Sequence, residues 1–288
     1  MRFLIILSTF SLIAVFADDT RNSKTWNLIN AHEAYRQGIT GKGVNVGIAD
    51  SPLNKNHISL RGKVGGELLS NRSDPWHGTA VASLIAGNKI DNFKPYGVAY
   101  DSVLYSYQAT GGRARPVGDF FTKNGVKIIN ASWGFPRNSW VERQQRTPQQ
   151  ALNAANTVGA ATHLYNLSRN NQTLLVFASG NETLISPQII AAVPTYDENL
   201  RSIINVGSLN PDLVFKQGNK IRITAKGTQT NGNVFLKSEN YSLMAFGANI
   251  NFAYAVRGHN WGYVKASGTS VAAPMVSGAA ALVAQKFP

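Results

Sequence analysis

Short apolar segments rich in β-branched residues recur along this chain and alternate with helical segments. The strand candidates are residues 43–50, 103–107, 126–130, 174–178 and 203–206. The helix candidates are residues 77–86, residues 149–168 and a last helix that begins near Ser270. Strands that alternate with helices in this way form a mostly parallel sheet with helices on its faces. The sequence therefore predicts an α/β fold, and it has no internal repeat that would favour a solenoid or a propeller.

Other segments carry local signals of structure. Asn30 and Glu33 have the spacing of a helix capping box, and Gly38 is placed to end that helix. Residues 136–147 form a polar and basic insertion. Residues 213–256 alternate in polarity and contain many turn-forming residues, which favours β structure.

Polar residues follow three of the apolar strand candidates. Asp50 closes the first, Ser132 closely follows the third, and Asn181 closely follows the fourth. The carboxyl ends of parallel strands lie at one edge of a sheet, where ligands and substrates bind. The sequence therefore predicts that these three residues share one site.

The distribution of charge argues against nucleic-acid binding, and the spacing of the histidines argues against a metal site. The net charge is +13, but the basic residues occur in short groups such as residues 113–115 and 143–146, and none alternates with aromatic residues. This pattern indicates a solvated basic surface, with a weak attraction to anionic cell surfaces, and no nucleic-acid partner. His57, His163 and His259 lack metal-ligand spacing, so no metal site is predicted and we interpret them as surface or structural residues.

The chain has no cysteine, which excludes disulfides, thiolate catalysis, zinc bound by cysteine and a lipid-modified cysteine. The first residues have the features of a secretory signal. Arg2 precedes an apolar run over residues 3–16, and residues 15–17 supply a small-residue cleavage site. The run is short for a membrane span, and the alternative interpretation is a core strand or an anchor helix. The expected division is a signal peptide at 1–17, a short N-terminal segment at 18–25 and one folded domain at 26–288.

Each polar residue at the predicted site has a structural explanation when it is taken alone. Asp50 suits a turn or a helix cap, and Asn181 after Gly180 suits a turn. His77 suits the exposed start of a helix, and Ser270 suits the cap of the last helix.

The segments around these four residues are more specific together. They read Val46-Gly47-Ile48-Ala49-Asp50-Ser51, His77-Gly78-Thr79-Ala80-Val81-Ala82, Ala178-Ser179-Gly180-Asn181 and Gly268-Thr269-Ser270-Val271-Ala272-Ala273-Pro274. Residues 96–99 and 130–134 are further landmarks. With these motifs in this order, the chain resembles the subtilisin-like serine peptidases over roughly residues 26–288.

The resemblance implies a three-layer α/β fold and a catalytic role for each of the four residues. Ser270 is the implied nucleophile, and His77 is the base that takes its proton and returns it to the leaving amine. Asp50 orients the imidazole and stabilises its charged form. The side-chain amide of Asn181 and the backbone N–H of Ser270 form the implied oxyanion hole.

By the same resemblance, a peptide or protein substrate lies extended between two segments of the chain. The implied walls are Ser132, Trp133 and Gly134 on one side and Ala178, Ser179 and Gly180 on the other. Trp133 is bulkier than the aliphatic residue usual in the family and is expected to narrow an outer subsite. Glu182 is either a carboxylate near the pocket mouth or a solvated loop acid, and the sequence leaves both interpretations open.

Three features depart from the family pattern. Ser51-Pro52 replaces a small residue and glycine, so the loop after Asp50 is expected to differ in shape while it retains the carboxylate. The few residues before the first domain helix leave no room for a folded inhibitory propeptide. The chain stops 18 residues after Ser270, so we expect a domain truncated at its C-terminal end.

A secreted domain of this kind, without a propeptide or cysteines and with a long insertion before the asparagine motif, resembles the passenger domain of a bacterial autotransporter. Such a domain would associate with the cell surface through a missing C-terminal region. The resemblance implies no required cofactor. Calcium stabilises many relatives, but no ligand set for it can be read from this sequence.

Two other functions remain to be separated from peptide hydrolysis. The first is a subtilisin-like module with an impaired site that acts in adhesion. The second is a lipase or esterase of the α/β-hydrolase type, which requires a Gly-x-Ser-x-Gly motif and the order serine, acid, histidine. Ser270 lacks the second glycine and comes last of the three, which disfavours the second alternative.

Overall fold

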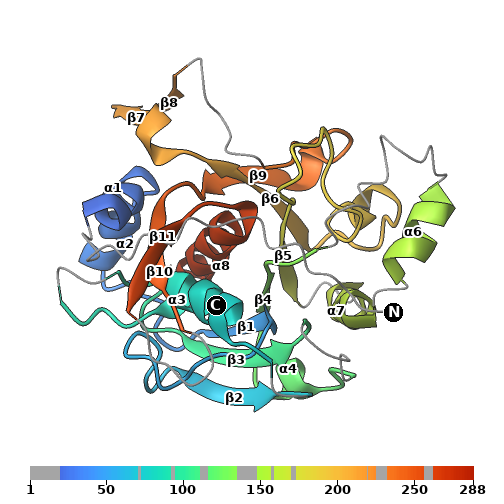
Figure 1. The fold of residues 1–288 in the computed structure, drawn as a ribbon, viewed down its shortest axis with the longest axis horizontal. Helices are drawn as coiled ribbons and strands as arrows, with labels where there is room; N and C mark the ends of the chain where they lie inside the picture. Colours follow the sequence, from blue (N-terminus) through green and yellow to red (C-terminus); the bar gives the residue numbers. More distant parts are fainter. Residues whose placement is uncertain are drawn as a thin grey trace.

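The structure of the chain is a computed structural model (Figure 1). It describes residues 20–70, 73–91, 95–110, 116–134, 148–156, 159–169, 173–218, 220–224, 232–255 and 262–288. The predicted signal peptide, the insertion at 136–147 and His259 lie outside these residues.

A seven-stranded sheet forms the centre of the molecule, with the strand order β2-β3-β1-β4-β5-β6-β9. The strands are β1 (Asn45–Asp50), β2 (Val64–Leu68), β3 (Val103–Gln108), β4 (Ile128–Ala131), β5 (Leu174–Ala178), β6 (Ile203–Leu209) and β9 (Ser242–Phe246). Every neighbouring pair is parallel. The predicted α/β fold with a mostly parallel sheet is confirmed.

The chain leaves β1 toward β2 and β3 on one side, and β4, β5 and β6 follow on the other side. This reversal between β1 and β4 creates a switch point, where the carboxyl ends of the strands are open to a ligand. Asp50 is the last residue of β1, and residues 132 and 181 follow β4 and β5. The three predicted site residues therefore lie at one edge of the sheet.

Helices cover both faces of the sheet, because alternate residues of each strand point to opposite sides. In β5, Val176 packs in a core with helices α3 (Trp76–Ala86) and α8 (Thr269–Lys286). Its neighbours Leu175 and Phe177 pack in a second core with α4 (Phe120–Lys123) and α7 (Gly159–Arg169). These two cores make the three layers of the fold, as Figure 1 shows.

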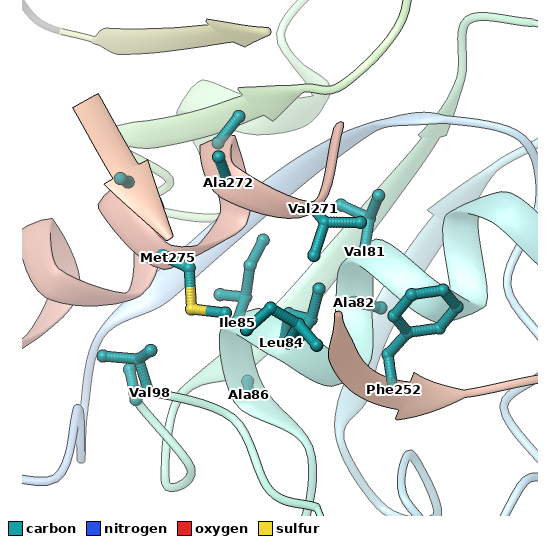
Figure 2. Close-up of a cluster of buried hydrophobic side chains, with 14 of the residues drawn as sticks. Val81, Ala82, Leu84, Ile85, Ala86, Val98, Phe252, Val271, Ala272 and Met275 are labelled. Carbon is teal, nitrogen blue, oxygen red and sulfur yellow. The ribbon is translucent and has the colours of Figure 1, made fainter. Parts of the chain in front are cut away.

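Helix α8 runs through the first core and is made largely of small residues. Figure 2 shows Val271 and Met275 of α8 beside Leu84 and Ile85 of α3. A Cβ on Gly278 would lie 2.7 Å from the Cβ of Val98, so only glycine allows this approach. The helix also contacts β4, β5, β6 and β9. The predicted last helix is present, and its small residues let it pack closely against the sheet.

The last turn of α8 is tied to the segment before β1. The Gln285 side-chain oxygen accepts hydrogen bonds from the backbone N–H groups of Thr40, Gly41 and Lys42, at 2.8, 2.7 and 3.1 Å. Its Nε2 donates to the carbonyl oxygen of Gly38, at 3.1 Å. One side chain therefore fixes the far end of the helix to a loop more than 240 residues earlier.

The remaining elements lie around this frame. They are helices α1 (Thr20–Leu28), α2 (Ala31–Arg36) and α6 (Pro148–Asn156), the 3-10 helices η1 (Val193–Thr195), η2 (Pro211–Leu213) and η3 (Glu239–Tyr241), and the antiparallel pairs β7 (Val214–Gln217) with β8 (Lys220–Ile223) and β10 (Ile250–Ala253) with β11 (Tyr263–Ala266). None of the helices in the described ranges is long and apolar enough to cross a bilayer.

The structure corrects two predicted helices. The single helix expected over 149–168 is two helices, α6 and α7. The capping box is wrong: Asn30 has a left-handed backbone and no side-chain cap bond. Glu33 instead accepts hydrogen bonds from Arg36 in the same helix and from Gln37 directly after it. A favourable ion pair along the helix surface therefore replaces the expected bond back to the start of the helix.

Helix α1 crosses the domain boundary that the sequence suggested between residues 25 and 26. Asn22 is fully buried and exchanges hydrogen bonds with the backbone of Asn251, donating to its carbonyl oxygen at 2.8 Å and accepting from its N–H at 3.1 Å. The amide of Asn22 thus ties helix α1 to the backbone of strand β10.

Candidate active site

A buried carboxylate and an imidazole form the first part of the site. Asp50 is 1% exposed at the end of β1, and its Oδ1 lies 2.8 Å from His77 Nδ1 in the first turn of α3. The same oxygen accepts the backbone N–H of Ser51, at 2.7 Å. An ionised Asp50 accepts only, so Nδ1 carries the proton and the lone pair is on Nε2. This is the tautomer that a general base requires.

The unusual Ser51-Pro52 pair supports this geometry. The Ser51 hydroxyl oxygen accepts the backbone N–H of Gly78, at 2.8 Å, and so joins the loop after β1 to the start of α3. A Cβ on Gly78 would lie 2.8 Å from the carbonyl oxygen of Pro52. The loop and the helix therefore meet closely, and the carboxylate stays in place as expected.

The environment of His77 shifts its pKa. Burial favours the neutral ring and lowers the pKa, but the charge of Asp50 and the hydrogen bond to it favour the protonated ring. The net result is that the pKa of His77 is raised above its ordinary value of 6.5. The edge of the ring also packs against Trp76, with ring centroids 5.1 Å apart.

Ser270 and Asn181 meet at the start of α8. A Cβ placed on Gly268 would lie 3.3 Å from Ser270 Oγ and 3.5 Å from Asn181 Nδ2, so both polar groups border one point. Val271, the next residue, lies in the same core as Val81 of α3, one turn beyond His77. Figure 2 shows Val271 beside Val81. The first turns of the two helices are therefore adjacent.

Thr269 fixes the orientation of Asn181. Asn181 Oδ1 accepts the backbone N–H of Thr269 at 2.8 Å and its hydroxyl at 3.1 Å, and that hydroxyl oxygen accepts the N–H of Gly180 at 3.1 Å. The oxygen end of the amide is thus occupied, and Nδ2 makes no hydrogen bond within the described residues. An oxyanion is stabilised by hydrogen-bond donors that have no other partner, and Asn181 Nδ2 is such a donor beside the Ser270 hydroxyl.

Ser270 and His77, the predicted nucleophile and base, are not hydrogen-bonded to each other in this structure. Ser270 Oγ forms no hydrogen bond to His77 or to any other described residue. Catalytic hydrogen bonds are commonly long before substrate binds. The structure therefore brings all four predicted residues to one edge but leaves this bond to be formed.

The two predicted substrate walls follow adjacent strands, β4 and β5. Ser132 accepts a hydrogen bond from the side chain of Asn130, at 2.8 Å, and Ser277 of α8 donates to the other end of that amide, at 2.9 Å. This chain of contacts links one wall to the nucleophile helix. Trp133 is half-buried, and its indole N–H donates to the carbonyl oxygen of Ala49, at 2.7 Å. The indole is thereby held against β1.

Glu182 is half-buried, and both its carboxylate oxygens are hydrogen-bonded. Oε1 accepts from Gln188 Nε2 and Oε2 accepts from Asn233 Nδ2, each at 2.8 Å. Burial raises the pKa of this carboxyl despite these bonds, which oppose the shift. The sequence left two interpretations of Glu182 open, and these contacts contradict the one in which it is a freely solvated loop acid.

The histidines outside the predicted site belong to no cluster of three or more His, Cys, Asp or Glu side chains in the described ranges. His57 is buried, its Nδ1 accepts the N–H of Ser59 at 3.1 Å, and its Nε2 lies 3.0 Å from the carbonyl oxygen of Gly262. Because Nδ1 accepts a hydrogen bond and Nε2 lies beside a carbonyl oxygen, these contacts fit a neutral ring with a structural role. No three His, Cys, Asp or Glu side chains gather at one point among the residues described, so the structure gives no such ligand set for calcium.

The parallel α/β sheet, the carboxylate bonded to an imidazole and the serine beside a free amide have the arrangement expected of a serine hydrolase site, in the order Asp, His, Asn, Ser. The family model described as the subtilase family matches residues 41–288. The chain therefore belongs to the subtilase family of serine peptidases, which confirms the resemblance seen in the sequence and excludes the α/β-hydrolase alternative.

Individual relatives agree with this assignment. The chain is 28% identical to Subtilisin DY of Bacillus licheniformis, over 91% of this chain and 84% of that protein. It is 23% identical to the autotransporter lipoprotein NalP of Neisseria meningitidis, over 91% of this chain but 30% of that protein. Among solved structures, the prenylagaramide maturation protease PagA has the same fold, with a TM-score of 0.64, 21% identity and coverage of 89% of this chain and 80% of that one.

Proposed function

We propose that this chain is a secreted serine endopeptidase that hydrolyses peptide bonds through an acyl-enzyme on Ser270. The observation that carries the proposal is the bond between Asp50 Oδ1 and His77 Nδ1, on a helix that packs against the helix whose start brings Ser270 Oγ and Asn181 Nδ2 together. Membership of the family indicates the class of reaction, and the geometry supports the role proposed for each of these four side chains.

In the proposed reaction, Ser270 Oγ attacks the carbonyl carbon of the scissile peptide while His77 Nε2 takes the hydroxyl proton. The negative charge that develops on the carbonyl oxygen is stabilised by Asn181 Nδ2 and the backbone N–H of Ser270. His77 then gives its proton to the leaving amine as the C–N bond breaks. Water, activated by the same imidazole, hydrolyses the ester. Every step uses a group of the chain, so the proposed mechanism requires no cofactor.

The proposed substrates are proteins and peptides that lie extended along residues 132–134, with residues 178–180 opposite. Nucleic acid is not a proposed partner. The proposed location is outside the cell, since residues 1–17 have the pattern of a signal peptide. The likeness to NalP supports the proposal of an autotransporter passenger domain associated with the cell surface.

Labelling by a fluorophosphonate tests the proposal, together with cleavage of a peptide whose two ends are blocked. The wild-type chain should be labelled at Ser270 and should cut the blocked peptide internally. The competing function is an impaired module that acts in adhesion. It is favoured by the absence of a bond to Ser270 Oγ within the described residues, and a folded chain that is neither labelled nor active would support it.

The activity should decrease as the pH is lowered, and the midpoint of this decrease should lie above pH 6.5. Below its pKa, His77 is protonated and cannot accept the proton of Ser270, so kcat/KM decreases as the pH falls. Because Asp50 raises the pKa of His77, the midpoint of this decrease should lie above the ordinary value of 6.5. A profile of kcat/KM from about pH 5 to about pH 9 measures it. A midpoint below 6.5 would contradict the assigned pair.

Replacement of Asn181 by leucine should lower kcat by about 10²–10³-fold and change KM little, a range that comes from subtilisin itself. The reason is that the donor acts on charge that develops only in the transition state. Steady-state kinetics of Asn181→Leu measure the effect, with Asn56→Leu on an exposed loop as the control. A rise in KM at constant kcat would instead assign Asn181 to ground-state binding.

A further inference from the structure

The side chain of Gln188 bridges the two segments that form the proposed substrate walls. A Cβ on Gly134 would overlap the Gln188 carboxamide, so the head of this side chain lies directly against the first wall. A Cβ on Gly180 would lie 2.6 Å from Gln188 Cγ, so its stem lies against the second wall. Gln188 is 6% exposed. Two glycines, one on each wall, therefore make room for one inserted side chain.

Hydrogen bonds hold Gln188 in this position. Its Nε2 donates to Glu182 Oε1 at 2.8 Å, and its backbone N–H donates to the carbonyl oxygen of Ser179 at 2.8 Å. Glu182 is fixed in turn by Asn233, which is fully buried. Asn233 also donates to the Ser179 carbonyl oxygen, at 3.0 Å, so the whole cluster is anchored to the second wall.

The other end of the Gln188 amide has no hydrogen-bond partner. Oε1 is buried and unsatisfied among the residues that the structure describes. An unsatisfied buried acceptor is energetically unfavourable. The conformation persists because Nε2 is bonded to Glu182 and because the stem is packed on Gly180. Gln188 is therefore held as a rigid insert, and swinging it aside would break the bond to Glu182.

We propose that Gln188 is the floor of the pocket for the residue before the cut, and that it restricts this pocket to small side chains such as alanine. This inference rests on the proposed function, which places an extended substrate between the two walls. A large apolar side chain would have to displace the carboxamide of Gln188 and leave the Glu182 carboxylate with one partner fewer. Alanine fits without either change.

Peptide p-nitroanilides that differ only in the last residue, alanine or phenylalanine, test this inference. The wild-type chain should have a kcat/KM at least about 10-fold higher for the alanine peptide, since a pocket discriminates by steric fit over about this range. A wild-type preference for phenylalanine would overturn the inference without any variant. A wild-type chain that cleaves neither peptide and takes no fluorophosphonate would overturn the proposed function instead.

Two substitutions distinguish the effect of the volume of the Gln188 side chain on substrate preference from the effect of its polarity. Gln188→Ala should raise the phenylalanine-to-alanine ratio of kcat/KM by about 10-fold or more, because it empties the floor. Gln188→Met keeps the length of the side chain and should leave the ratio within about 3-fold of wild type. The control is Gln37→Ala, an exposed glutamine after α2. An unchanged ratio in Gln188→Ala with retained alanine activity, or an equal rise in Gln188→Met, would overturn the inference.

Discussion

Replacing Ser270 by alanine should lower kcat for peptide hydrolysis by about 10⁶-fold, the loss that subtilisin itself shows for its serine. The alanine chain has no group that can form the acyl-enzyme, so only catalysis by the oxyanion donors and by binding remains. Residual activity about 10³–10⁴-fold above the uncatalysed rate is therefore still expected. Steady-state kinetics of both chains, compared with the uncatalysed rate, measure both quantities, and a fluorophosphonate should label the wild type alone.

This substitution should leave the fold unchanged. Ser270 Oγ makes no hydrogen bond with a described residue, so its removal breaks none, and the melting temperature should stay near that of the wild type. Ser23→Ala on helix α1 is a matched serine control for activity. If Ser270→Ala retained most of its activity while Ser23→Ala behaved like wild type, the nucleophile would have to be another residue.

Replacing Asp50 by asparagine should lower kcat/KM by about 10⁴-fold, as the loss of this carboxylate does in other serine peptidases. An asparagine amide can donate to His77 Nδ1, which would place the ring proton on Nε2 and leave no lone pair to accept the proton of Ser270. The loss should thus occur in kcat, with Ser270 still in place.

The same substitution should also move the pH profile, and the direction follows from the causes of the shift. Burial lowers the pKa of His77, and both effects that raise it come from Asp50. Without the carboxylate only the lowering effect remains, so the acid limb of the residual activity should move to lower pH. Asp119→Asn, at an exposed aspartate before α4, is the control. An acid limb that stays in place would show that Asp50 does not set this pKa.

The sequence carried enough information to place Asp50, Ser132 and Asn181 at one edge of the sheet. Apolar runs identify the buried strands, and in a parallel sheet the residues after them share an edge. By contrast, β2 was not predicted, because Gly65 and Gly66 interrupt its pattern. Glycine weakens a strand locally, and only pairing with β3 stabilises this one.

Local signals failed where long-range contacts decide the structure. Asn233 and Gln188 were not predicted to belong to the site, and no signal near either residue could have indicated it. Asn233 reaches Ser179 from 54 positions away, in a region where the sequence indicated only β structure. Thr269 was within the serine motif, but its role in orienting Asn181 depends on a contact across 88 positions. Tertiary contacts of this kind are not encoded in spacing.

The central position of α8 limits how far the chain can fold during translation. Residues 269–286 cover one face of β4, β5, β6 and β9, and Gln285 joins them to residues 38–42. While the ribosome is still elongating the chain, the strand with Asp50 and the helix with His77 have emerged, but the core that packs them does not yet exist. The first core therefore cannot be completed in the nascent polypeptide before translation has passed residue 286.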